Sequence, residues 1–130
     1  TPGMWDVMDQ GPYNNNGRTP PTYSAYERNA LGWIDPVVVT SPESLTFKSI
    51  IDNNEACLIP VSKNEFFLLE NRQQTGWDKY LPGSGLLIWH IDYNYAPWHN
   101  NTVNNTRSHQ YVDLEEACNE TVSIYDYVIG

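Results

Sequence analysis

The chain has 130 residues, with 7 basic and 16 acidic side chains and a formal net charge of −9. This length suits one domain of ordinary size. Its content of 40% hydrophobic and 13% aromatic residues excludes intrinsic disorder, because disordered chains lack the bulky groups that offset the entropy of ordering. The acidic balance argues against binding to nucleic-acid phosphates and to anionic lipid surfaces. No apolar run approaches the roughly 20 residues of a membrane helix. We therefore expect neither nucleic acid nor a membrane as a partner.

Residues 1–21 contain many Gly, Pro and Asn residues, so no regular element is expected there. Large apolar side chains in this segment are expected to pack against the rest of the protein; they are Met4, Trp5, Val7, Met8 and Tyr13.

Residues 22–31 predict a short helix with Thr22 as its N-cap. One helical face would carry the apolar residues Tyr23, Tyr26, Ala30 and Leu31. Gly32 suits the left-handed position that follows a helix.

From residue 33 onward the pattern favours β structure. The candidate strands are residues 37–39, 45–51, 57–59, 65–72 and 85–93, with weaker candidates at 111–114 and 122–129. Residues 66–69 and 86–89 are apolar on both faces, which predicts central strands covered on each side. The expected fold is α+β and mostly β, with one short helix followed by a β-rich sheet or sandwich.

Residues 94–110 form an Asn-rich segment that is expected to be a long loop, and long loops are often functional or mobile. The aromatic residues Tyr93, Tyr95 and Trp98 next to Asn and Asp side chains could stack on sugars. The alternative, which we favour, is that Trp98 anchors the loop to the body of the domain.

The two cysteines, Cys57 and Cys118, are compatible with a disulfide or with two free buried thiols. A crosslink over this separation would stabilise the fold by about 4 kcal/mol if it were unstrained. Separation along the chain says nothing about geometry, so both alternatives stay open.

Three runs of sequence resemble a known family. The first is Gly-Met-Trp-Asp-Val-Met-Asp-Gln-Gly at residues 3–11, followed by Tyr13-Asn14-Asn15 and by residues 24–33. The second comprises residues 67–73, 76–78 and 81–92, and a weaker third run covers 109–117. Together they resemble the part of the immune inhibitor A metallopeptidases that follows the zinc-binding helix. These enzymes look like relatives of the metzincins.

The resemblance implies a division of the chain and roles for two residues. Residues 1–33 would be the Met-turn segment and helix of a catalytic domain, and residues 34–130 the β-rich C-terminal part of the same unit. Met8 would be the Met-turn residue, whose polarizable thioether lies beneath a zinc site without binding the metal. Tyr13 would be a cleft residue. Without the resemblance, Met8 would be interpreted as a core residue in a loop.

The family binds zinc through a His-Glu-x-x-His helix, in which two His bind the metal and the Glu activates water. The three histidines of this chain, His90, His99 and His109, do not have that spacing. The resemblance therefore implies that the zinc ligands and the catalytic base lie in an upstream half of the same polypeptide. The chain alone would be inactive. The whole protein would be a secreted or cell-surface enzyme that acts on proteins or peptides.

Two further groups are candidate sites. Glu70, His90 and Asp92 could meet if their strands are neighbours, as the border of a substrate cleft, as a metal site, or as a hydrogen-bonded polar cluster where the strands leave the core. Asp6 and Asp9 could bind calcium, although turn chemistry explains that segment equally well.

Two functions follow from these patterns. The first is a piece of a secreted zinc-dependent endopeptidase that supplies the Met-turn and the cleft wall. The alternative is a non-catalytic β-rich module that binds carbohydrate or protein. Sequence preceding Thr1 would discriminate between them, because only the first predicts His-Glu-x-x-His there.

Overall fold

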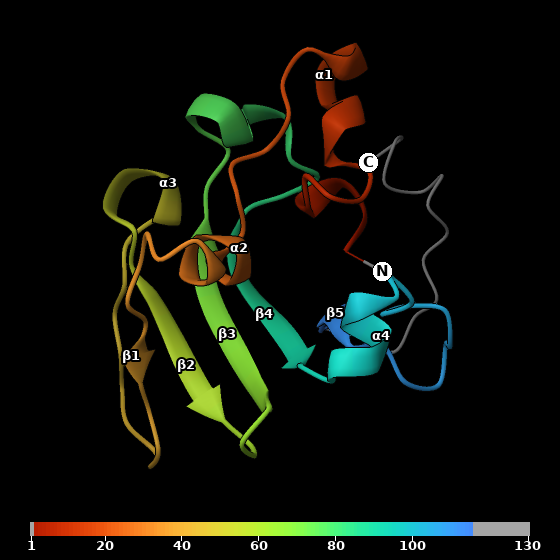
Figure 1. Cartoon of the computed structure of the whole chain (residues 1–130). Coiled ribbons are helices and arrows are strands. Elements are labelled where there is room, and N and C mark those ends of the chain that lie inside the picture. The colour runs from red at the N-terminus through yellow and green to blue at the C-terminus, as the bar shows by residue number, and fades with distance from the viewer. Residues whose placement is uncertain (1, 116–130) are drawn as a thin grey trace.

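The computed structural model describes residues 2–115 (Figure 1). The helices are η1 (Gly3–Trp5), η2 (Gly11–Tyr13), α1 (Asn14–Gly17), α2 (Ala25–Ala30), α3 (Ile50–Asn53), η3 (Gly76–Tyr80) and α4 (Tyr95–His99), where η denotes a 3-10 helix. The strands are β1 (Val37–Val38), β2 (Ala56–Pro60), β3 (Glu65–Arg72), β4 (Gly85–Asp92) and β5 (Val112–Leu114). The α+β class is confirmed, although helices and strands occupy similar shares of the chain. The described strands form one sheet and no sandwich.

The sheet has the order β1-β2-β3-β4-β5, with β1 parallel to β2 and all other neighbours antiparallel. Strands β3 and β4 lie in the middle, and their bounds match the expected 65–72 and 85–93 to within one residue. Both strands combine an apolar run with flanking turn residues, which is a pattern that indicates strands.

The core lies on one face of the sheet. Leu68 of β3 is paired across the ladder with Trp89 of β4, and both side chains are fully buried. Helix α2 lies over this face and contributes Ala25, which is also fully buried (Figure 1). The N-terminal segment reaches the same core through Trp5. Residues 2–33 and the sheet therefore share one hydrophobic core.

The opposite face of the sheet is only partly covered among the described residues. Leu86 is 57% exposed, and Phe67, Leu69 and Ile88 on the same face are partly exposed. The expectation that both faces of β3 and β4 would be covered is therefore wrong for this part of the chain. An antiparallel sheet tolerates one open face, because only one side must pack on a core.

Helix α2 begins two residues later than predicted. Its N-cap is Ser24, not Thr22, because Ser24 and Glu27 form a reciprocal capping box. The expected apolar face is also partly wrong, since Ala25 is buried while Leu31 is exposed. Gly32 has the predicted left-handed conformation, with φ of 75°.

Three other expectations met different outcomes. Residues 45–51 form no strand; instead, helix α3 begins at Ile50. The segment 94–110 contains helix α4, capped by Asn94, and Asn104 exchanges two hydrogen bonds with the backbone of Val112. The candidate strand at 122–129 lies outside the described residues. Between residues 2 and 115, none of the helices has the length and apolar character needed to cross a membrane.

Candidate functional site

The Met8 turn is held from inside by two carboxylates. The buried Asp6 accepts a hydrogen bond through Oδ1 from the backbone N–H of Met8 at 2.6 Å. Asp9 accepts one through Oδ2 from the N–H of Gly3 at 2.8 Å. A Cβ at Gly11 would lie 2.5 Å from the carbonyl oxygen of Asp6, so this close return of the chain requires glycine. The turn is therefore tightly specified by its sequence.

The side chain of Met8 points away from this support, because it is 84% exposed. Tyr13, five residues later, is 75% exposed. Two expectations are wrong here. Met8 is not a core residue of this chain, and Tyr13 does not pack against the rest of the protein. Trp5 does pack on the core, as expected. Met8 is one of several large apolar side chains that are exposed among the described residues.

Glu27 brings a second carboxyl group to the inner side of the turn. Its Oε2 accepts the hydrogen bond of the capping box from the N–H of Ser24 at 2.7 Å. Its Oε1 is buried, and its carboxyl group contacts that of Asp6. Burial and the nearby charge of Asp6 raise the pKa of Glu27 to about 7. Burial also raises the pKa of Asp6 above its usual value.

These carboxyl groups border a cavity of about 470 Å³, which is within the size range of ligand pockets. Its lining residues are Pro2, Asp6, Met8, Asp9, Tyr26, Glu27, Trp98, Asn101, Val103, Asn104 and Val112. The ring centroids of Tyr26 and Trp98 are 5.2 Å apart. Trp98 donates its indole N–H to the carbonyl of Asp92 at 2.8 Å. It therefore anchors the 94–110 segment, which confirms the interpretation favoured for it.

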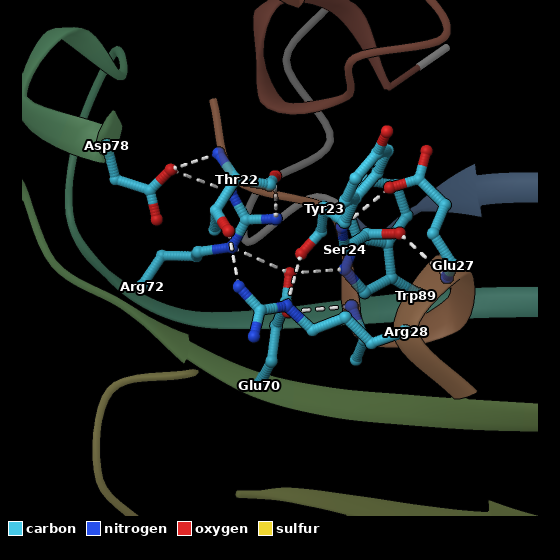
Figure 2. A network of polar contacts seen from close by, with 10 residues as sticks. Thr22, Tyr23, Ser24, Glu27, Arg28, Glu70, Arg72, Asp78 and Trp89 are labelled. Atoms are coloured by element: carbon cyan, nitrogen blue, oxygen red, sulfur yellow. Dashed lines mark hydrogen bonds and ion pairs between the residues drawn. The ribbon is translucent and has the colours of Figure 1, made fainter. Parts of the chain in front are cut away.

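A buried ionic cluster lies beside helix α2 (Figure 2). Nε of Arg72 is 3.1 Å from Oε1 of Glu70, and its Nη1 is 3.5 Å from Oδ1 of Asp78. All three side chains are fully buried. Burial raises the pKa of Glu70, against the opposing effects of the Arg72 charge and of its hydrogen bonds. Burial likewise raises the pKa of Asp78.

The cluster ties the segment before α2 to the sheet. Glu70 accepts hydrogen bonds from the N–H of Ala25 at 2.9 Å and from the indole N–H of Trp89 at 2.8 Å. Oδ1 of Asp78 accepts a hydrogen bond from the backbone N–H of Thr22 at 2.8 Å (Figure 2). These bonds fix the start of the helix that carries Glu27, and so the position of Glu27 beside the cavity.

The three expected cleft residues Glu70, His90 and Asp92 do not form one cluster. Glu70 lies on the covered face of the sheet, whereas His90 lies on the open face, opposite Phe67. There, Nε2 of His90 is 2.8 Å from Oε1 of Glu65. Asp92 pairs with His109, also at 2.8 Å. A register with a period of two places Glu70 and His90 on opposite faces, which the sequence could not show without the pairing of β3 with β4.

Sequence reasoning missed Glu27, Arg72 and Asp78. A signal existed for Arg72, since it follows Leu68 and Glu70 at alternate positions and so had to share their face of β3. No pattern pointed to Asp78 or to the meeting of Glu27 with Asp6. Both depend on contacts between segments far apart in the sequence.

Within residues 2–115, no group of three or more His, Cys, Asp or Glu side chains is placed to hold a metal ion. Asp6 and Asp9 both bond to backbone N–H groups, and calcium binding by them stays a prediction. Cys57 is buried on β2, but Cys118 lies outside the described residues, so their pairing also stays open.

Comparisons of the chain with protein-family models, with curated proteins and with solved structures gave no match. The resemblance to the immune inhibitor A family therefore stays a prediction.

Proposed function

We propose that this chain is part of a secreted zinc-dependent endopeptidase, in which it supplies the Met-turn and a wall of the substrate cleft. The observation that carries the proposal is the Met8 turn, in which Met8 is 84% exposed while its backbone N–H is held by the buried Asp6. A thioether presented in this way is suited to lie beneath another group that covers it. The resemblance over residues 3–33 supports the same role.

In this proposal the chain has a positioning role. The zinc ligands and the water-activating Glu would belong to an upstream half of the polypeptide, as the resemblance to the immune inhibitor A family implies. The Arg72 cluster holds α2 on the sheet, and α2 and the turn frame the cavity from two sides. The substrate would be a protein or peptide lying along this wall.

The proposal is tested with the natural polypeptide that contains this chain. It should cleave an unstructured protein such as casein, lose that activity with a chelator and regain it with added zinc. Met8→Ala should lower kcat/KM moderately without abolishing zinc binding. The 130-residue chain alone should not cleave casein. Failure of the natural polypeptide to show chelator-sensitive cleavage would overturn the assignment.

A non-catalytic binding module is the alternative. The exposed rings of Tyr93 and Tyr95 favour it, since such rings can stack on a sugar. Trp98 is already engaged in packing and in a hydrogen bond, which removes the largest of the three rings from that role. Saturable glycan binding that Tyr95→Ala abolishes, together with absence of proteolysis, would establish this alternative.

A further inference from the structure

We propose that Asn100 carries an N-linked glycan in the secreted protein, whereas the neighbouring Asn104 does not. The inference takes the secreted location from the function proposed above and adds a covalent modification of the surface. It starts from three matches to the acceptor pattern Asn-x-Ser/Thr, which begin at Asn100, Asn104 and Asn119. Asn119 lies outside the described residues, so the structure discriminates between the first two matches.

The first argument is that the side chain of Asn100 is free while its backbone is fixed. Asn100 is exposed, and its carboxamide makes no hydrogen bond with the rest of residues 2–115. Its backbone N–H donates to the carbonyl of Ala96 at 3.0 Å, where helix α4 ends. The carboxamide is therefore presented to solvent from a defined turn, which is the kind of surface position that an N-linked glycan requires.

The second argument concerns Thr102, the hydroxyl residue of the same pattern. Thr102 is exposed, and its backbone N–H donates to the carbonyl of Pro97 at 2.8 Å. Its hydroxyl oxygen lies 3.5 Å from that carbonyl, which is long for a hydrogen bond. The hydroxyl is therefore held only weakly by the fold. The acceptor amide and the hydroxyl that a transferring enzyme must recognise both lie in the turn that follows α4.

The third argument is the contrast with Asn104, which has the same pattern but a committed side chain. Its Nδ2 donates to the carbonyl of Val112 at 2.8 Å, and its Oδ1 accepts from the N–H of Val112 at 3.2 Å. The carboxamide thus pairs with strand β5 as the backbone of another strand would, and Asn104 is half-buried. A sugar on Nδ2 would have to fit into this contact. The folded chain therefore disfavours a glycan at Asn104.

The modification is a group transfer from an oligosaccharide that is linked to a lipid pyrophosphate. A bond forms between Nδ2 of Asn100 and the anomeric carbon of the oligosaccharide. The bond between that carbon and the pyrophosphate oxygen breaks, and its electron pair leaves with the lipid pyrophosphate. The amide nitrogen gives up one proton. The transferring enzyme and the lipid-linked donor belong to the secretory pathway through which the polypeptide would pass.

The test is peptide mass spectrometry of the natural polypeptide, isolated in its secreted form. Peptide N-glycosidase in water enriched in heavy oxygen converts a glycosylated Asn into a labelled Asp, and fragment spectra place the label on one residue. We expect the label at residue 100 and none at residue 104. Because the readout does not involve casein cleavage, its failure is distinguishable from failure of the proposed protease function.

Variants at the hydroxyl position identify the pattern responsible. Thr102→Ala leaves Asn100 in place and should abolish the label at residue 100, whereas Thr102→Ser still satisfies the pattern and should retain it. Thr106→Ala, the matched change in the second pattern, should leave the labelled residue unchanged. An unmodified Asn100 in the secreted polypeptide, a label at Asn104, or a label at Asn100 that persists in Thr102→Ala would overturn the inference.

Discussion

The ionisation of Glu27 depends on its burial and on Asp6, and we therefore expect the stability of the chain to depend on pH. Its pKa rises from 4.5 to about 7 on folding, because burial and Asp6 both disfavour the charged form. A group with a raised folded pKa contributes stability that is full below its unfolded value and is lost as pH rises through the folded value. The free energy of unfolding should therefore fall between about pH 4.5 and about pH 7. Urea titrations of the chain and of Glu27→Gln measure this, and an unchanged slope in the variant would contradict it.

Replacing Arg72 should have a large effect on stability, because Arg72 is the cation between two fully buried carboxyl groups. We expect Arg72→Met to lower the free energy of unfolding by about 3–5 kcal/mol, since removing one partner leaves buried charge uncompensated. Arg107→Met, at an exposed position, is the matched control and should change it by no more than about 0.5 kcal/mol. Similar midpoints in urea for the two variants would mean that the cluster does not hold α2 on the sheet.

At the scale of the element, helix α2 depends on its capping box. Ser24→Ala removes the acceptor for the N–H of Glu27 and should cost about 1 kcal/mol. Ser62→Ala, at an exposed loop position, should cost much less. Thermal or urea unfolding measures both variants. An equal effect of the two changes would show that the helix start is fixed by the Arg72 cluster alone.

For the Met8 turn we expect a small effect on stability, in contrast to the changes at Arg72 and Ser24. Because the thioether is mostly exposed, Met8→Ala should change the stability of the 130-residue chain by no more than about 0.5 kcal/mol. The same substitution should still lower the activity of the natural polypeptide if another segment covers the turn there. A large loss of stability in the isolated chain would contradict the exposed position of Met8.

The elements differ in how well their sequence specifies them. Strands β3 and β4 were predicted to within one residue, because their short length and flanking turn residues favour a strand over a buried helix. Helix α2 was placed with the wrong cap, because Thr22 and Ser24 are both good cap residues and only the position of Glu27 decides between them. Residues 45–51 alternate too weakly to distinguish a strand from the extended segment and short helix that form there.

At the scale of the whole molecule, the candidate site could be predicted only in part. The Met8 turn was found because its residues are contiguous and resemble a family pattern. The contact between Asp6 and Glu27, which helps to line the cavity, joins segments 21 residues apart in the sequence. The grouping of Glu70 with His90 failed because face and register are properties of the assembled sheet.

We propose that the chain helps to house a zinc site whose ligands it does not contain. The most direct measurement is the zinc content, after dialysis, of the natural polypeptide and of the 130-residue chain. We predict one tightly bound zinc in the natural polypeptide and none in the isolated chain. Stoichiometric zinc in the isolated chain, or its absence from the natural polypeptide, would contradict the account.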